Sequence, residues 1–548
     1  MFIVAYPKTV KCPLTLTLRM SSTRLDPVGT GSHPSVVESD DQSKVQEIDI
    51  LNPGSMRLST TKTAEAEEYN AGSENEKGRQ DGNEKPRPVG FWHHDLVNVR
   101  LHVIKLWART VLILFVFVLL VLSLFNGVFY HIPKNFSSLI VYVVDFDGQV
   151  APYQEGTPLV GPMIVQATET IARSETPHLG YITMPPSMFK SDPIAVRQAI
   201  YDFKAHAAII VNANATALLR QAVDQGNATY DPNGAAQIIY VSARDQNTIP
   251  TYVVPQLTAL ERALTSQFGS SWAQSLMQNT TISRANLQNA PQAVSPAIGF
   301  TTFDLRPFGP ANVTPAVSIG LIYLIIIAFF SFAFFLPIHL KYLSPRGHPP
   351  LHFHQLIAWR WFATTAAYFF LSLSYSFMAL AFQVPFTKPP ASQTEPAINP
   401  TAYGKGTFVV YWMINFFGMA ALGLSCENVA MALGQPWTAM WLIFWVITNV
   451  STGFYSLDLT PRFYYWGYAW PLHHVVEASH QVLFDLHSRI GLNFGVLITW
   501  TVINTLLFPP ACYLMRWKQE SAARKAKAKE EEWMKAMCKQ RTRLGLPK

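Results

Sequence analysis

The feature that most constrains this chain is a set of long apolar stretches that carry no charged side chain. Residues 311–339 contain no Asp, Glu, Lys or Arg, and neither do residues 111–130. A charged side chain at the centre of a bilayer costs about 2.5–3.5 kcal/mol on insertion scales. Charged residues make up 14% of the whole chain, whereas soluble domains typically contain about 25%. We therefore predict an integral membrane protein.

Six segments combine this apolarity with the length of roughly 20 residues that a helix needs to cross a bilayer. Tryptophan and tyrosine are frequent at their edges, as expected for amphipathic rings at the depth of the lipid headgroups. The prediction is a polytopic α-helical membrane protein with a first transmembrane helix at 106–130 and five more within 317–515. These five are placed at 317–339, 356–382, 407–425, 437–455 and 493–515.

Lysine and arginine are concentrated at alternate ends of these segments: before the first, between the second and third, and after the sixth. The positive-inside rule places such residues, and with them both termini, in the cytoplasm. The segment 131–316 then lies outside the cell. Four candidate motifs for N-glycosylation fall in that segment, at Asn135, Asn214, Asn227 and Asn279, and a fifth at Asn312 is weakened by the following Pro315 and by its closeness to the membrane. Charge and glycosylation motifs thus predict the same topology for a multi-pass glycoprotein.

The outer segment 131–316 is predicted to be an inserted extracellular α/β domain. Strand patterns at 139–144, 207–211 and 236–241 alternate with helical patterns at 162–173, 213–223 and 253–268. This alternation favours a partly parallel sheet. The segment has no cysteine, so it must be held by its own apolar core. Asp145 and Asp147 end the first strand. A turn explains them, and a divalent-metal pair is the alternative.

The two ends of the chain have different compositions. Residues 1–95 are mostly rich in Ser, Thr, Asp, Glu and Gly, which predicts a disordered cytoplasmic tail. Residues 516–548 contain 11 Lys and Arg against 4 Asp and Glu, a balance of +7. Such a basic cytoplasmic tail is attracted to anionic inner-leaflet lipids by about 1 kcal/mol per charge. The positive-inside rule alone also explains it, and no pattern points to nucleic acid.

Two segments carry the candidate functional side chains. Glu427 lies at the cytoplasmic end of the fourth span, where it pairs with a cation or senses protons. An amphipathic, interfacial or re-entrant segment at 468–490 places His473, Glu477 and His480 on one helical face. These three side chains suit a proton relay or a zinc site, but their spacing differs from His-Glu-x-x-His and a fourth ligand is absent. We therefore predict no metal site.

Motifs for common enzymatic chemistry are missing from the sequence. It contains no Gly-x-x-x-x-Gly-Lys-Ser/Thr motif for binding ATP and no nucleophile elbow of a hydrolase. We therefore expect a protein that is not an enzyme and that needs no cofactor.

Several motifs resemble those of the fungal nitrosoguanidine-resistance membrane protein family. They are WVITNVS at 445–451, PRFY at 461–464, WGYAWP at 466–471, LFDLHSRIGLNFG at 483–495 and SCEN at 425–428, and the resemblance extends over residues 94–517. That family is in turn similar to type-2 ABC-transporter permeases and phage-infection-protein-like membrane proteins. The resemblance implies a type-2 ABC-permease-like arrangement, a plasma-membrane location, and a homodimer or a partner membrane subunit. It also implies a role in drug resistance.

Two functions follow from these expectations. In the first, the protein exports hydrophobic compounds or lipids, and Glu427, His473, Glu477 and His480 are candidates for coupling transport to protons. In the second, the protein is a non-transporting regulator or scaffold of plasma-membrane lipid asymmetry. Energy-dependent export by the purified protein would distinguish the first from the second.

Overall fold

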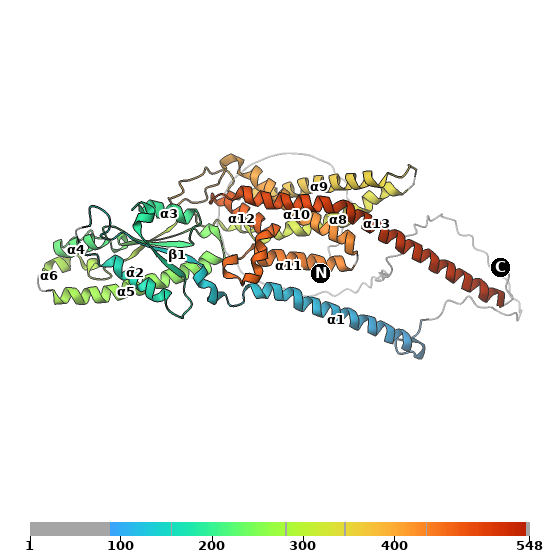
Figure 1. Ribbon diagram of the computed structural model, residues 1–548, viewed down its shortest axis with the longest axis horizontal. Coiled ribbons are helices and arrows are strands. Elements are labelled where there is room, and N and C mark those ends of the chain that lie inside the picture. The colour runs from blue at the N-terminus through green and yellow to red at the C-terminus, as the bar shows by residue number, and fades with distance from the viewer. Residues whose placement is uncertain (1–87, 155, 280–281, 345–346, 435, 544–548) are drawn as a thin grey trace, which may run out of the picture. The chain divides into compact units, whose positions relative to one another are not determined.

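The computed structural model describes residues 88–543 except residues 155, 280–281, 345–346 and 435 (Figure 1). Residues 1–87, which make up most of the tail predicted to be disordered, lie outside the described part, and so do residues 544–548. Within the described part, one long helix is followed by a segment of alternating helices and strands. A second segment, made of helices alone, completes it.

The first segment contains a five-stranded mixed sheet with strand order β2-β1-β3-β4-β5. β1 pairs in parallel with β2 and β3, β4 is antiparallel to β3, and β5 is parallel to β4. The strands are β1 (Ile140–Asp145), β2 (Gly180–Met184), β3 (Ala207–Val211), β4 (Ala236–Tyr240) and β5 (Phe300–Asp304). The three predicted strands are therefore found, and β2 and β5 are additional.

Helices cover both faces of the sheet. Alternate residues of a strand point to opposite faces, so Val141 and Val143 of β1 pack in one apolar cluster and Val144 in another. α2, α4 and α5 lie on the first face and α3 on the second (Figure 1). These helices are α2 (Val160–Ala172), α3 (Pro193–Tyr201), α4 (Ala215–Gln225) and α5 (Val254–Gln278), with the short α6 (Arg284–Asn289) beside α4. The cluster on the α3 face continues into the helical segment.

Five described helices are long and apolar enough to cross a membrane. They comprise α1 (Val97–Val128), α8 (Ile322–Leu340) with the turns around it, α9 (Phe353–Ala381), α10 (Thr407–Leu433) and the first part of α13 (Ile490–Arg543). Each overlaps a predicted span. The chain is therefore a polytopic helical membrane protein.

The predicted span at 437–455 is a shorter helix than expected. It corresponds to α11 (Trp437–Gly453), which has 17 residues and is not among the five candidate spans. Gly434, with φ +72°, and Pro436 precede it, and Phe454 caps its other end. α11 packs against α1 and α10. Asn247 of the α/β domain donates a hydrogen bond of 2.8 Å from its side chain to the Phe454 carbonyl.

α10 is the central helix of the helical segment and contacts α8, α9, α11, α12 and α13. Its close packing depends on small residues. A Cβ atom added at Gly423 would lie 2.6 Å from the Ala328 Cβ and 2.6 Å from the Tyr368 hydroxyl. Real Cβ atoms do not approach other atoms so closely, so Gly423 lets α8 and α9 pack against the same stretch of α10.

α12 (Pro471–Phe484) differs from a helix that lies on a membrane surface. Its apolar face packs against α10 and α13, as an amphipathic pattern predicts, but the α/β domain covers the other face. As a result, eleven of its fourteen residues are buried. α13 also differs from a simple span, because it continues as one helix of 54 residues past residue 515 to Arg543 (Figure 1). Most of the basic segment 516–548 is thus helical.

Candidate functional site

The structure separates the four candidate coupling residues. Glu427 lies among α9, α10 and α13, whereas His473, Glu477 and His480 lie at the end of the helices that meets the α/β domain.

Glu427 forms a buried ion pair with Arg360 of α9. The Arg360 Nη2 and Glu427 Oε1 atoms are 2.6 Å apart, and each residue is 2% exposed. The guanidinium also lies 3.4 Å from the Met431 sulfur, 3.5 Å from the Cys512 sulfur and 5.4 Å from the centre of the Phe508 ring. Of the two expected roles, the structure supports pairing. Arg360 was not predicted, although an arginine inside an apolar span is a visible signal.

Three candidate residues line one polar cavity between α12, the segment before it, and the α/β domain. Its volume is about 160 Å³. We call it the polar cavity. Its charged and imidazole side chains are those of His206, Arg244, Asp245, Asp458, His473, Glu477, His480 and Arg489. The sequence predicted the lining residues on α12, which are His473, Glu477 and His480. It did not predict the others, because they come from segments that only folding brings close to α12.

Each histidine in the polar cavity has one ring nitrogen bonded to an oxygen. His473 Nδ1 is 3.1 Å from the Thr452 carbonyl, and His480 Nδ1 is 2.9 Å from the Ala243 carbonyl. His206 Nε2 is 3.4 Å from the Asp458 carboxylate. These oxygens only accept, so each bonded nitrogen carries the hydrogen. Burial lowers the pKa of all three imidazoles, that of His473 to about 4, so they are neutral near pH 7.

The charged side chains of the polar cavity are largely held by local partners. Glu477 lies 3.6 Å from Arg489, and Arg244 donates to the Ala205 carbonyl at 2.9 Å while lying over the Phe203 ring. Asp245 accepts hydrogen bonds from the Asn247 and Thr248 backbone amides and from the Thr248 hydroxyl. The hydrogen bond from His206 is the main cause of a lowered pKa at Asp458.

The two α12 histidines of the polar cavity are bonded to different segments of the chain. Within the described residues, no group of three or more His, Cys, Asp or Glu side chains is arranged to hold an ion. His473 and His480 are bonded to different segments, at Thr452 and Ala243, so their rings are fixed by separate partners. The arrangement instead makes a polar chamber with neutral imidazoles and several carboxylates.

Asp145 and Asp147 act within the backbone turn. Asp147 accepts hydrogen bonds from the Thr216 amide at 2.9 Å and the Gly161 amide at 3.2 Å, at the starts of α4 and α2. Asp145 accepts from the Asp147 amide at 2.9 Å. These bonds account for both carboxylates as turn and helix-capping groups. Burial raises the pKa of Asp145 to about 6.

The four glycosylation candidates differ in exposure. Asn227 and Asn279 are exposed, whereas Asn135 and Asn214 are half-buried. The Asn135 side-chain amide donates to the Leu459 carbonyl at 2.8 Å. The accessible acceptors are therefore Asn227 and Asn279, and modification at all four stays a prediction.

A second, apolar cavity lies between α8, α9 and α10 at the end of the helices nearest the α/β domain. Its volume is about 430 Å³, and we call it the apolar cavity. Its lining includes Pro315, Ala316, Tyr323, Ile327, Tyr375, Met378, Ala379, Phe382 and Tyr411. Tyr323, Met378 and Phe382 are more than half exposed, so the cavity opens on the outer surface of the helices.

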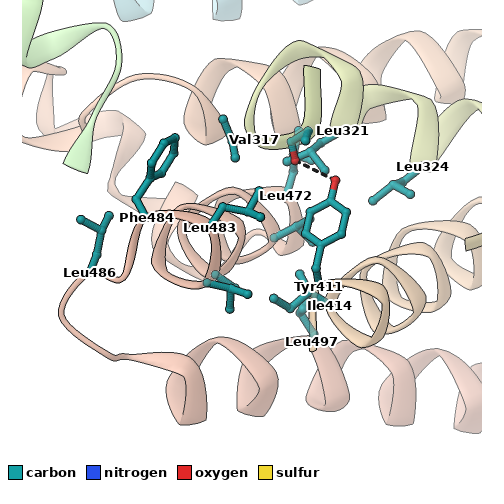
Figure 2. Packing of buried hydrophobic residues seen from close by; sticks show 14 of the residues in the cluster. Val317, Leu321, Leu324, Tyr411, Ile414, Leu472, Leu483, Phe484, Leu486 and Leu497 are labelled. Carbon is teal, nitrogen blue, oxygen red and sulfur yellow. Dashed lines mark hydrogen bonds between the residues drawn. The ribbon is translucent and has the colours of Figure 1, made fainter. Parts of the chain in front are cut away.

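A short helix, α7 (Thr314–Val317), separates the two cavities. Val317 lines the polar cavity, and its neighbours Pro315 and Ala316 line the apolar one. Tyr411 of α10 holds this wall by donating a hydrogen bond of 2.9 Å to the Ala316 carbonyl. Figure 2 shows Tyr411 directed toward the turn that carries Val317 and Leu321, with Leu472 and Leu483 of α12 nearby.

Comparison with known proteins links the chain to other membrane proteins. The family described as "Protein of unknown function (DUF3533)" matches residues 110–506. The uncharacterized endoplasmic reticulum membrane protein YJR015W of Saccharomyces cerevisiae is 26% identical over 439 residues, which cover 77% of this chain and 82% of that protein. No solved structure matches the chain.

Proposed function

The chain belongs to the DUF3533 family of proteins of unknown function, and we propose that it is a permease-like protein that passes hydrophobic compounds or lipids across its membrane. The apolar cavity is the observation that carries this proposal. Its volume of about 430 Å³ falls within the range of roughly 300–1,000 Å³ found for ligand pockets. It faces the surface that lipid contacts, so a hydrophobic molecule reaches it from the bilayer.

We further propose six spans in a type-2 ABC-permease-like arrangement, with α11 as the fifth. A helix of 17 residues rises about 25 Å and is at the short limit for crossing the hydrocarbon core. α11 begins at the end of α10 far from the α/β domain and ends beside that domain. With six crossings both termini lie on the same side of the membrane, and the positive-inside rule favours the cytoplasm for them and the outer or lumenal side for the α/β domain.

The buried Arg360–Glu427 pair is the candidate for coupling transport to protons. Charged residues inside membrane helices are costly and commonly mark ion or proton pathways. The chain has no ATP-binding motif, so in this proposal a gradient, or an ATPase partner of a homodimer or heteromer, supplies the energy. A role in drug resistance follows if exported compounds include toxic ones.

In this proposal, the membrane in which the protein resides is either the plasma membrane or the endoplasmic reticulum membrane. The resemblance seen in the sequence favours the plasma membrane, whereas the yeast relative carries an endoplasmic reticulum name. Fluorescence microscopy of the tagged full chain, with a marker for each membrane, distinguishes these locations.

Binding to the apolar cavity is tested with the purified protein and a hydrophobic fluorescent dye. Ala379→Phe places a ring in the cavity, and we expect it to lower dye affinity at least about fivefold because the added ring occupies part of the volume. Ala363→Phe on the same helix lies outside the lining and serves as the matched control. Equal binding by both folded variants would remove the cavity from the proposal.

A second candidate function, a regulator or scaffold of lipid asymmetry, is favoured by the long C-terminal extension of α13. From Arg516 to Arg543 this helix is largely exposed where described and carries many basic side chains. Such a helix suits contact with anionic inner-leaflet lipids or a partner chain. Removing residues 524–548 distinguishes the two functions. A transporter without this segment still moves its substrate across the membrane, whereas a scaffold without it no longer maintains lipid asymmetry.

A further inference from the structure

The polar cavity contains more negative than positive groups. Asp245, Asp458 and Glu477 supply three carboxylates, and Arg244 and Arg489 supply two guanidinium groups. Desolvation lowers the pKa of the three imidazoles, so they are neutral near pH 7, and each directs one N–H at an oxygen acceptor. The side chains around the cavity therefore favour a cation over an anion.

The unpartnered polar atoms of this cavity are acceptors. Among the described residues that line it, the buried side-chain atoms without a hydrogen bond are His206 Nδ1, His480 Nε2 and Gln246 Oε1. His206 is 93% buried, because its exposed fraction is 7%. Its Nε2 donates to Asp458, which leaves the Nδ1 lone pair free to accept. Buried acceptors without donors are costly, so they indicate a donor that enters the cavity.

The size of the cavity limits the ligand. About 160 Å³ is well above the roughly 10–15 Å³ that one water needs. It is below the roughly 300 Å³ at which pockets for drug-sized molecules begin. A group of a few non-hydrogen atoms therefore fits.

We propose that the polar cavity binds a small primary ammonium group, which brings one positive charge and three N–H donors to the acceptors of His206, His480 and Gln246 and to the neighbouring carboxylates. Two sources share this chemistry: a soluble amine, or the ammonium headgroup of a lipid. The lipid source fits the position of α7, since a headgroup on the Val317 side has the apolar cavity on the other side of the same short helix. This site goes beyond the proposed transport and does not depend on it.

The test uses the full chain in nanodiscs made of phosphatidylcholine, with ethanolamine as the titrant in isothermal titration calorimetry. We expect ethanolamine to bind and choline, which has no N–H donor, to bind at least about tenfold more weakly. Equal binding of choline would overturn recognition through N–H donors, because aromatic side chains such as Phe203 and Tyr468 also line the cavity and hold quaternary cations without them.

Two variants tie the binding to the cavity. Glu477→Gln removes one carboxylate, and His480→Leu removes one acceptor. We expect each to weaken ethanolamine binding about tenfold, because each removes a partner of the ammonium group. His178→Leu is the matched control, because His178 lies in the α/β domain away from the cavity. If Glu477→Gln, which keeps its shape, binds ethanolamine as the wild type does, the site is wrong.

Nanodiscs that contain phosphatidylethanolamine separate the two sources. If the lipid headgroup occupies the cavity, soluble ethanolamine binds more weakly in these discs than in pure phosphatidylcholine. If a soluble amine is the ligand, its affinity is the same in both, and the proposal still holds. No binding of ethanolamine in phosphatidylcholine, together with no change of thermal stability when phosphatidylethanolamine is added, would show that the cavity holds water alone and overturn the proposal.

Discussion

At the residue scale, Arg360 and Glu427 stand out because two oppositely charged side chains are buried together between apolar helices. Each ion compensates the desolvation cost of the other. Removing one member therefore destabilises the protein strongly, because the remaining charge is buried without a partner. Glu427 was visible in the sequence as a lone acid in an apolar segment. Its partner is 67 positions away, and no local pattern encodes that pairing. The same reason hid His206 and Asp458, which reach the polar cavity from outside α12.

The ion pair gives a prediction for stability. We expect Glu427→Gln or Arg360→Met to destabilise the protein by about 3–5 kcal/mol, since each leaves an uncompensated buried group. The double variant Arg360→Met with Glu427→Gln should destabilise the protein by less than the sum of the two single changes, because it leaves neither charge unpaired. Thermal unfolding in detergent measures all three. Additive effects would mean that the two side chains do not interact.

Asp145 gives a prediction for pH dependence. Burial raises its pKa from 3.8 to about 6. A pKa that is higher in the folded state stabilises the fold below pH 3.8, and this contribution is lost as pH rises through 6. The difference corresponds to about 3 kcal/mol. We therefore expect Asp145→Asn to gain stability relative to the wild type between pH 4 and pH 7 in thermal unfolding. Parallel profiles for the two proteins would contradict this.

At the scale of elements, the sequence predicted the buried strands better than the edge strands. β1 and β3 are internal strands with β-branched, buried residues, so they appear as apolar runs. β2 and β5 lie at the two edges, are largely half-buried or exposed, and include Gly180, Thr301 and Thr302. An edge strand with one open side needs no apolar run. The burial of α12 was missed because the α/β domain, rather than lipid or water, covers its polar face.

Glycines of the helices give a prediction at this scale. Gly423→Ala places a methyl group 2.6 Å from Ala328 and Tyr368, and we expect it to destabilise the packing of α10 by about 1–3 kcal/mol. Gly495→Ala in α13 is the control, because nothing lies within 4 Å of its added Cβ. The control should be neutral or stabilising, since alanine favours a helix. A comparable loss of stability in both variants would show that close contact at Gly423 is not the cause.

At the scale of the whole molecule, composition was enough to predict a membrane protein, and spacing was enough to place five of its spans. The sixth depends on α11, whose 17 residues lie at the short limit for crossing. The sequence alone could not show that the two ends of α11 lie at opposite ends of the helical segment. It also could not show the two cavities on either side of α7, because their walls come from segments that are far apart along the chain.

The topology gives a further prediction. If the α/β domain lies on the outer or lumenal side, the exposed Asn227 and Asn279 are accessible for glycosylation, whereas Asn135 is half-buried. We expect Asn227→Gln and Asn279→Gln each to lower the apparent mass by one glycan on gels, and Asn135→Gln to leave it unchanged. Glycosidase treatment should abolish the differences. A chain without glycans at any of these positions would argue against the outer placement.

The central claim, that the protein passes hydrophobic molecules across its membrane, is tested most directly by transport in sealed vesicles. Purified protein of known orientation is assayed with a fluorescent lipid and a cationic dye, with and without a pH gradient. We predict movement toward the side of the α/β domain, lost in Ala379→Phe and kept in Ala363→Phe. No movement under any gradient, from folded and correctly oriented protein, would contradict autonomous transport and favour a regulator or a permease that requires an ATPase partner.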